Sequence, residues 1–189
     1  MVILGIDPGY GIVGYGVIEK AQNGKCSLID YGTIKTPTSE TFPIRLAIIE
    51  EGITKLIEKF KPDAVAVEEL FFNTNITTGI MVAEARGVIV CAAVKSCGNL
   101  FEYSPPQIKQ AITGNGRAEK HQVQYMTRIM LNLKEIPRPD DAADALAVAL
   151  THAQTNNLLR DNSMMQYFKL KSGRRKTKWY TKLKEKFHQ

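Results

Sequence analysis

The sequence predicts an α/β protein in which helices cover both faces of a mixed β-sheet. In residues 1–35, strand-like apolar runs are separated by short turns rich in glycine, a pattern typical of antiparallel strands. From residue 41 onward, apolar residues recur at helical spacing, and short apolar strands alternate with these helices. Because a helical connection favours parallel pairing of the strands that it joins, the two halves together indicate a mixed sheet.

Three strands are expected before the first helix, at Val2–Ile6, Val13–Ile18 and Cys26–Lys35. The first is almost continuously apolar, as expected of a strand that is buried on both faces. Tight turns at Asp7–Gly11 and Gln22–Lys25 connect the three strands into an antiparallel set. Glycines within the second strand predict either a β-bulge or a close approach of another backbone.

Seven further elements follow, each predicted from the spacing of its apolar residues. In order, they are a helix at Thr41–Phe60, a strand at Ala64–Val67, a helix at Thr77–Lys95, a strand at Leu100–Tyr103, and helices from Pro105 to about Ile112, at Ala118–Leu133 and at Asp140–Gln154. The helix at Thr77–Lys95 is rich in glycine and alanine, so another helix or strand can approach it closely.

The composition is that of an ordinary soluble globular protein, since 44% of the residues are hydrophobic and 23% are charged. No apolar run reaches the roughly 20 residues that a membrane-spanning helix needs, so no membrane association is expected. The N-terminal residues predict a first strand and not a signal peptide. Cys26, Cys91 and Cys97 lack the spacing of metal ligands and suit reduced thiols, which predicts a cytoplasmic protein.

The positive charge is concentrated at the C-terminal end of the chain. Residues 169–189 hold nine Lys and Arg against one Glu, a local charge of +8, which leaves −2 for the rest of the chain. We therefore expect a globular domain at residues 1–155 and a basic tail at residues 156–189. Such an arm commonly contacts nucleic-acid phosphates without sequence preference, and a disordered solubilising end is the equally supported alternative.

Acidic residues stand at the ends of several predicted elements. Asp7 follows the first strand, Glu68 follows the strand at Ala64–Val67, and Asp141 and Asp144 lie at the start of the last helix. A carboxylate at the rim of an apolar core is costly, and several brought together repel one another unless cations neutralise them. The pattern therefore predicts a divalent-metal site and metal-assisted phosphoryl chemistry.

Each acidic position also has a simpler interpretation when taken alone. Asp7 can cap the Asp-Pro-Gly turn, and the pair of Glu68 and Glu69 can mark a strand that ends in a solvated loop. Acids near a helix N-terminus favourably meet the helix dipole, and Asp140 after a proline is a natural N-cap. Capping needs one acid and not three, and the alanines around Asp144 let this helix pack closely on a sheet, so metal ligation explains more of the pattern.

An ordered set of short motifs adds a family resemblance over residues 1 to about 155. The motifs are Gly5-Ile6-Asp7-Pro8-Gly9, Gly14-Tyr15-Gly16, Glu68 with Phe71, Ala85-Arg86-Gly87, Lys109-Gln110, Ala118-Glu119-Lys120 with Gln122-Val123-Gln124, and Asp141-Ala142-Ala143-Asp144-Ala145-Leu146-Ala147. In this order they resemble the bacterial RuvC-type Holliday junction resolvases, which are crossover junction endodeoxyribonucleases. The resemblance implies an RNase H-like fold with a five-stranded mixed sheet, three of whose strands are antiparallel, flanked by helices.

The resemblance also implies the active site. Asp7, Glu68, Asp141 and Asp144 match the family's acidic quartet, which would hold two Mg²⁺ ions, or Mn²⁺ in their place, about 4 Å apart. The Asp-x-x-Asp pair aligned on Ala-Leu-Ala selects Asp141 over the neighbouring Asp140 as a ligand. The implied reaction is an in-line hydrolysis of a DNA phosphodiester that leaves a 5′ phosphate and a 3′ hydroxyl. Paired symmetrical nicks would then resolve a four-way junction during homologous recombination and repair.

Five further positions match residues that would contact DNA. Phe71 matches an aromatic position used near the junction, and of Phe71 and its neighbour we expect one buried and one exposed side chain. Lys109 and Lys120 match basic residues that line the family's cleft, and Arg86 and Arg117 are secondary candidates for backbone contacts.

A four-way junction has near two-fold symmetry, and the family is dimeric, so a homodimer is expected with the helix at Thr77–Lys95 as its interface. Family membership further implies a junction-binding protein and a branch-migration motor as partners. Alternatives are another RNase H-like nuclease that acts on RNA–DNA hybrids or as a general endonuclease, a junction-binding scaffold without catalysis, and an actin-like ATPase. The retained acids disfavour the scaffold, and the chain is too short for the two domains of the ATPase.

Overall fold

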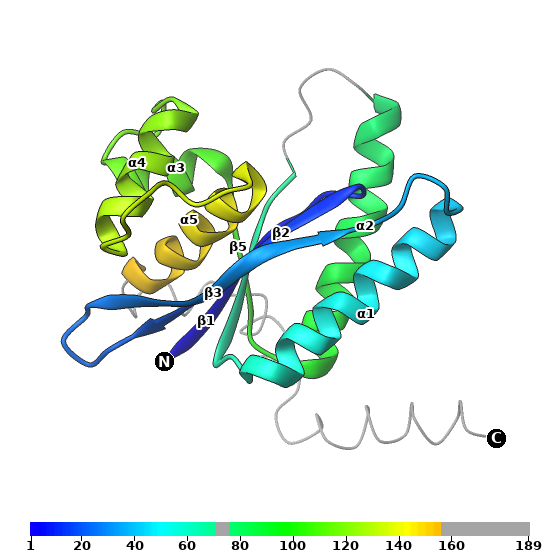
Figure 1. The fold of residues 1–189 in the computed structure, drawn as a ribbon, viewed down its shortest axis with the longest axis horizontal. Helices are drawn as coiled ribbons and strands as arrows, with labels where there is room; N and C mark the ends of the chain where they lie inside the picture. Colours follow the sequence, from blue (N-terminus) through cyan, green and yellow to red (C-terminus); the bar gives the residue numbers. More distant parts are fainter. Residues whose placement is uncertain (71–75, 156–189) are drawn as a thin grey trace, which may run out of the picture. The chain divides into compact units, whose positions relative to one another are not determined.

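A five-stranded mixed sheet lies at the centre of the structure, with strand order β3-β2-β1-β4-β5 (Figure 1). The computed structural model describes residues 1–70 and 76–155, so the expected basic tail lies outside the described residues. The strands are β1 (Val2–Asp7), β2 (Ile12–Lys20), β3 (Cys26–Lys35), β4 (Ala64–Glu68) and β5 (Leu100–Tyr103). The pairs β1–β2 and β2–β3 are antiparallel, whereas β1–β4 and β4–β5 are parallel. The mixed sheet expected from the sequence is therefore confirmed.

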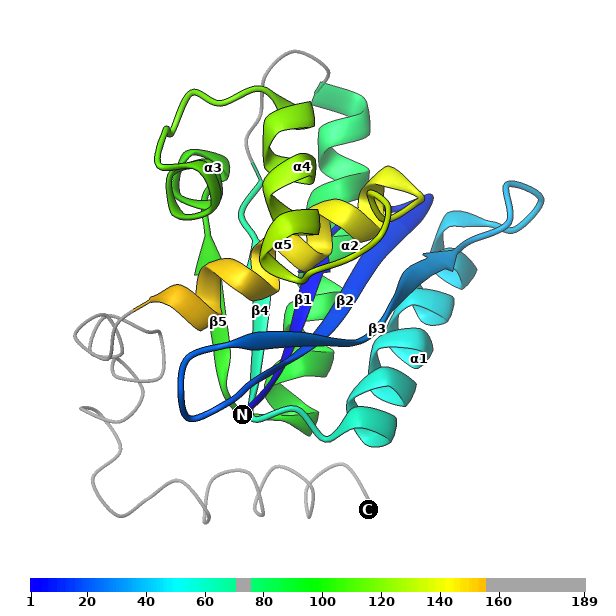
Figure 2. The ribbon, with the colours of Figure 1, turned by 60° about the vertical axis from the view of Figure 1, so that its left-hand side comes forward.

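Helices cover the sheet on both faces (Figure 2). They are α1 (Phe42–Phe60), α2 (Ile76–Ser96), α3 (Pro105–Thr113), α4 (Lys120–Met130) and α5 (Asp140–Gln154). The helices α1 and α2 pack on one face, while α5 lies across the other face with α3 and α4 packed outside it. No helix among the described residues is both long and apolar enough to cross a membrane.

Local signals at the ends of α3 and α4 explain where these two helices begin. The side chain of Gln107 accepts a hydrogen bond from the backbone N–H of Ser104 at 2.8 Å, and Gln122 accepts from Glu119 at 2.9 Å. Each glutamine thus satisfies a donor that the helix leaves unpaired. The helix predicted at Ala118–Leu133 is shorter than expected at both ends, because Glu119 is its N-cap and Leu131 is its C-cap.

The side chains of the central strands alternate between two cores. Ile3 of β1 and Ala66 of β4 belong to the core under α3, α4 and α5, whereas the intervening residues Leu4, Ile6, Val65 and Val67 pack toward α1 and α2. Successive residues of a strand point to opposite faces. The residues that end the two strands, one position beyond Ile6 and Val67, therefore project onto the face that α5 covers.

Glycines let α5 rest directly on the backbone of the sheet. A Cβ atom added to Gly5 would lie 2.2 Å from the carbonyl oxygen of Ala145, and one added to Gly14 would lie 2.0 Å from that of Asp141. Neither distance is compatible with a side chain, so both positions require glycine for close approach. The close approach predicted for the glycines of β2 is confirmed, whereas the register shift opposite Val17 and Ile18 leaves the extra residue, Ile29, on β3.

Candidate active site

Two adjacent parallel strands bring Asp7 and Glu68 together. Ile6 of β1 pairs with Val67 of β4, so the next residue of each strand lies at the same carboxyl edge of the sheet. Alternation points both carboxylates toward α5. Glu68 is partly buried and Glu69 is exposed, so the structure resolves which of the two acids faces the packed side.

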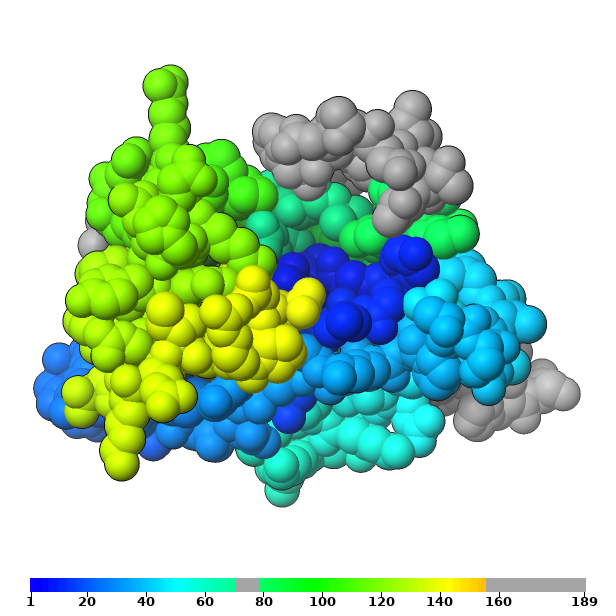
Figure 3. Space-filling model, turned by 45° about the horizontal axis from the view of Figure 1, so that its top comes forward, coloured from blue at the N-terminus to red at the C-terminus, as the bar shows by residue number. Residues whose placement is uncertain are grey.

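The start of α5 supplies Asp141 and Asp144. Close packing on Gly14 fixes the backbone of Asp141 above β2, and the buried alanines Ala142, Ala143 and Ala145 leave no bulk between helix and sheet. In the space-filling view, the yellow start of α5 lies against the dark blue β1–β2 region (Figure 3). Three elements that are far apart in the sequence thus converge on one site.

Burial and mutual repulsion raise the pKa values of three of these carboxyl groups. Burial raises the pKa of Asp7 well above its usual range, and the charges of Glu68, Asp144 and Asp141 raise it further. The pKa of Glu68 rises to about 7, chiefly through burial and then through the charge of Asp144. Burial also raises the pKa of Asp144, although a hydrogen bond from Lys120 opposes the rise. The site therefore favours neutralisation by protons or by cations.

Lys120, the first residue of α4, supplies one positive charge to the site. Its Nζ lies 2.6 Å from Oδ2 of Asp144 and 3.8 Å from Oδ2 of Asp140. Burial alone would lower the pKa of Lys120, but the hydrogen bond and charge of Asp144 outweigh it and raise that pKa. The ammonium group therefore remains charged beside the carboxylates.

A cavity of about 160 Å³ opens beside the carboxylates. Its lining residues are Glu68, Pro105, Ile108, Lys109, Lys120, Val123, Asp144 and Ala147. Lys109 also lowers the pKa of Glu68 through its charge, although burial outweighs this effect. Two lysines and two acids thus share one cleft, as expected for a site where a phosphate group meets bound cations.

The other acidic, basic and aromatic residues considered for the site lie in different surroundings. Asp140 forms ion pairs with Arg138 and Lys120. The charge of Asp141 contributes to the raised pKa of Asp7, whereas that of Asp140 does not. Arg117 is exposed on the turn before α4. Phe71 and its neighbour Phe72 lie outside the described residues, so their expected orientations stay predictions.

Arg86 has internal partners. Its guanidinium pairs with the carboxylate of Glu102 on β5, and its Nε donates a hydrogen bond to the carbonyl oxygen of Glu68 at 3.3 Å. The expected contact of Arg86 with the DNA backbone stays a prediction. Sequence reasoning missed Glu102, because a single acid in a short strand gives no signal of the residue that pairs with it.

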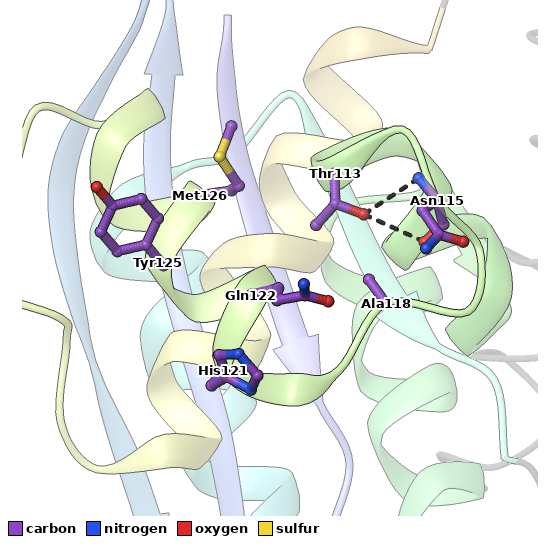
Figure 4. Close-up of a pocket in the computed structure, with 7 residues that line it drawn as sticks. All are labelled: Thr113, Asn115, Ala118, His121, Gln122, Tyr125 and Met126. Carbon is purple, nitrogen blue, oxygen red and sulfur yellow. Dashed lines mark hydrogen bonds between the residues drawn. The ribbon is translucent and has the colours of Figure 1, made fainter.

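A second hollow lies outside the carboxylate site, along α4 and the end of α3 (Figure 4). Its lining residues are Thr113, Asn115, Ala118, His121, Gln122, Tyr125 and Met126. The hydroxyl of Thr113 donates to the carbonyl oxygen of Asn115 at 3.1 Å and accepts from its N–H at 3.2 Å. The side chain of Asn115 accepts a further hydrogen bond from the N–H of Arg117 at 3.0 Å. These bonds stiffen the turn that leads into Lys120 and so help to position it.

The chemistry of the donor set fits a hard divalent cation. Carboxylate oxygens are the ligands that Mg²⁺ and Mn²⁺ prefer, and the raised pKa values show that uncompensated negative charge is costly here. Within residues 1–70 and 76–155, no group of three or more His, Cys, Asp or Glu side chains is arranged as a metal site. In this arrangement the positive charge that pairs with Asp144 is the ammonium of Lys120.

A mixed sheet of this topology, with acidic side chains at the ends of its adjacent parallel strands, is the arrangement of an RNase H-like nuclease. The family model for crossover junction endodeoxyribonuclease RuvC matches residues 3–152. The chain therefore belongs to the RuvC family of crossover junction endodeoxyribonucleases.

Individual relatives support this assignment. The chain is 52% identical to the RuvC endonuclease of Ruminiclostridium cellulolyticum over 158 residues, which cover 84% of this chain and 95% of the relative. It is 54% identical to that of Alkaliphilus metalliredigens over 157 residues, covering 83% and 95% of the two chains. The structure of T. thermophilus RuvC in complex with a Holliday junction substrate superposes with a TM-score of 0.77 at 40% identity, covering 82% of this chain and 93% of that one.

Proposed function

We propose that the protein resolves four-way DNA junctions and that Asp7, Glu68, Asp141 and Asp144 form its catalytic centre. The observation that carries the proposal is the convergence of these carboxylates, from β1, β4 and α5, beside a cleft that also contains Lys109 and Lys120. Membership of the endodeoxyribonuclease family supplies the reaction class, which is hydrolysis of a DNA phosphodiester. The implied products carry a 5′ phosphate and a 3′ hydroxyl.

The four carboxylates would hold two Mg²⁺ ions in each active site, and Mn²⁺ would substitute. When bound, such ions activate a water molecule and stabilise the charge on the leaving oxygen. The carboxylates fix the positions of these charges, and the packed start of α5 keeps Asp141 and Asp144 from moving away from the strands. Asp140 is left out of the ligand set because it pairs with Arg138 and, unlike the other acids, does not contribute to the raised pKa of Asp7.

Cationic side chains around the cleft would bind the DNA backbone. Lys109 and Lys120 line the cleft, where their ammonium groups can meet a phosphate next to the carboxylates. Arg117 is exposed on the neighbouring turn and can extend this contact. Phe71 completes the proposal as an aromatic contact near the junction, and the basic residues 156–189 would add affinity that does not depend on sequence.

The exposed face of α2 supports a homodimer. Five of its exposed residues recur at alternating spacings of four and three along one stripe, and they are Ile80, Glu84, Gly87, Cys91 and Val94. Ile80 and Val94 are 54% and 46% exposed, and a Cβ atom added to Gly87 would meet no atom within 4 Å. A glycine in the interior of a helix costs about 1 kcal/mol relative to alanine, and close packing of a second helix would offset that cost.

A dimer formed through this stripe would present two active sites to a substrate with near two-fold symmetry. Junction-binding and branch-migration proteins are proposed as partners in the same pathway. We also propose a cytoplasmic location, where the free thiols of Cys26, Cys91 and Cys97 would stay reduced.

Cleavage of a synthetic four-way junction tests the proposed function. We expect the wild-type protein to nick two opposed strands symmetrically in Mg²⁺ and to leave duplex DNA and RNA–DNA hybrid largely uncut. Asp7→Asn should lower cleavage by at least about a thousandfold while junction binding in EDTA persists, because it removes a ligand and no DNA contact. The neighbouring pair Asp140→Asn and Asp141→Asn supplies a matched comparison, in which only the second should lose cleavage. Equal cleavage by Asp7→Asn and wild type would refute the proposed centre.

A further inference from the structure

The end of β4 is held from the face opposite the carboxylates. Arg86 projects from α2, and its Nε donates a hydrogen bond to the carbonyl oxygen of Glu68 at 3.3 Å. On the other side of the same peptide unit, the N–H of Glu69 donates to the carbonyl oxygen of Tyr103 at 2.9 Å. Both polar groups of the peptide that follows Glu68 are therefore satisfied, and the backbone at this residue is fixed in two directions.

Glu102 fixes Arg86 in turn. The guanidinium of Arg86 forms a hydrogen-bonded ion pair with the carboxylate of Glu102, and each side chain is only 22% exposed. Glu102 pairs with Val67 across the sheet, so it lies on the face of α1 and α2, away from the side chain of Glu68. A partly buried, charge-assisted pair is stronger than an exposed one and holds the planar guanidinium in one orientation.

We propose that Arg86 and Glu102 are positioning residues that hold Glu68 in place for metal binding and cleavage. Glu68 is the last residue of β4. It still pairs with Tyr103 of β5, but the pairing of β4 with β1 ends at Val67, so neighbouring strands restrain Glu68 on one side only. Arg86 adds a second restraint through its hydrogen bond to the carbonyl oxygen of Glu68, and Glu102 holds Arg86 in position for this bond. This inference rests on the proposed role of Glu68 as a metal ligand. It differs from a DNA-contacting role for Arg86, because the arginine acts through the backbone of Glu68 and not through a phosphate.

The test compares Arg86→Gln, Arg86→Lys and Glu102→Gln with the wild-type protein. Arg86→Gln removes the charge and the fork of donors, whereas Glu102→Gln leaves an oxygen that can still accept a hydrogen bond from Arg86. Lysine keeps the charge but cannot donate to both partners as a planar fork does. Lys55→Gln is the matched control, since it breaks the ion pair with Glu51 on α1, where the two side chains are 71% and 64% exposed.

Four measured quantities distinguish a positioning role of Arg86 and Glu102 from a phosphate-contacting role and from a purely structural one. They are the Mg²⁺ affinity measured by calorimetry without DNA, the Mg²⁺ concentration for half-maximal junction cleavage, the salt dependence of junction binding in EDTA, and Tm in EDTA. For Arg86→Gln we expect Mg²⁺ affinity to fall about 10- to 100-fold, as for other residues that orient metal ligands, with the half-maximal Mg²⁺ concentration rising in parallel. Glu102→Gln and Arg86→Lys should fall between this variant and wild type, and Lys55→Gln should match wild type. Junction binding should change less than about twofold.

Three results would overturn the inference. One is an unchanged Mg²⁺ affinity in all three variants. Another is weaker junction binding with a lower salt slope at unchanged Mg²⁺ affinity, which would make Arg86 a phosphate contact. The third is a lower Tm with an unchanged Mg²⁺ affinity of the folded protein, which would make the pair structural. Should Arg86→Gln fail to fold, the two conservative variants carry the same comparison. Failure of the proposed function would appear separately, as a wild-type protein that binds Mg²⁺ but leaves four-way junctions uncut.

Discussion

At the scale of single residues, three carboxyl groups of the proposed site are destabilised in their ionised forms. The pKa values of Asp7, Glu68 and Asp144 are raised because burial and neighbouring charges disfavour their ionised forms. In the metal-free protein these carboxyl groups therefore lower the stability, a trade-off that is common where groups are arranged for catalysis, as we propose for these. Lys120 relieves part of this cost through its ion pair with Asp144.

Replacing Glu68 should stabilise the metal-free protein at alkaline pH. The pKa of Glu68 is about 7 in the folded state and near 4.5 when unfolded, so the folded state binds the extra proton between these values. Stability should therefore fall as pH rises through this window. At pH 8 in EDTA, we expect Glu68→Gln to raise the free energy of unfolding by about 1–2 kcal/mol and Tm by about 2–8 °C.

Thermal melts at pH 5 and pH 8, with EDTA and with Mg²⁺, measure this effect. The gain of Glu68→Gln over wild type should shrink at pH 5, where the wild-type carboxyl group is protonated. Added Mg²⁺ should raise the Tm of wild type more than that of the variant, since the variant lacks one of the proposed ligands. Glu58→Gln, on the exposed surface of α1, is the matched control and should show neither effect. A Tm of Glu68→Gln at or below that of wild type in EDTA at pH 8 would contradict this reasoning.

At the scale of elements, α5 is the part of the fold on which the site depends most. Its first two turns carry Asp141 and Asp144, and its contact with Gly5 and Gly14 leaves no room for side chains at these two positions. The two glycines therefore shape the proposed active site through packing.

Gly14→Ala should displace the start of α5. The new methyl group would collide with the backbone of Asp141, and overpacking of this kind typically costs about 1–3 kcal/mol of stability. Because displacement of a catalytic group by about 1 Å can cost about 100-fold in rate, cleavage should fall by a similar factor. Denaturant melts and junction cleavage measure the two effects. Glu19→Ala changes an exposed residue of the same strand and should alter neither quantity. If Gly14→Ala cleaved junctions as fast as wild type, cleavage would not depend on close contact between α5 and β2.

Local patterns predicted the elements well, and long-range contacts were predicted less well. The strand at Leu100–Tyr103 and the helix at Asp140–Gln154 were found at their predicted bounds, because apolar spacing and proline signals are local. The motifs identified Glu68 over Glu69, which agrees with the exposure of Glu69. Arg86 and Glu102 are 16 positions apart in the sequence and lie on different elements, and no local pattern encodes such a contact. Likewise, the ion pair between Lys120 and Asp144 depends on how α4 packs on α5.

At the scale of the whole molecule, the exposed stripe on α2 is the surface that we propose for the homodimer. Buried residues such as Ala85 and Ile89 already anchor α2 to the core, so its opposite, largely apolar face is available to a second copy. An isologous contact of this kind uses one patch twice and closes after two subunits.

Gly87→Arg should break the proposed dimer. A long charged side chain at the point of closest helix approach would prevent packing and leave an unpaired charge at the interface. Sedimentation equilibrium should give the mass of two chains for wild type and of one chain for the variant. The variant should nick single strands of a junction without pairing the two cuts. Gln22→Arg adds the same charge to an exposed turn and should stay dimeric, and a dimeric Gly87→Arg would place the interface elsewhere.

The contact between α5 and the glycines of the sheet fixes the distance between the helix and the strands. Where main chain touches main chain, the separation is set by the dimensions of the peptide group, and these do not vary with sequence. Substitutions that change the size of core side chains elsewhere can therefore accumulate without altering the distance from Asp7 to Asp141. A redesign of this domain could replace most of both cores and keep the spacing of these two carboxylates, provided that Gly5 and Gly14 stay as they are.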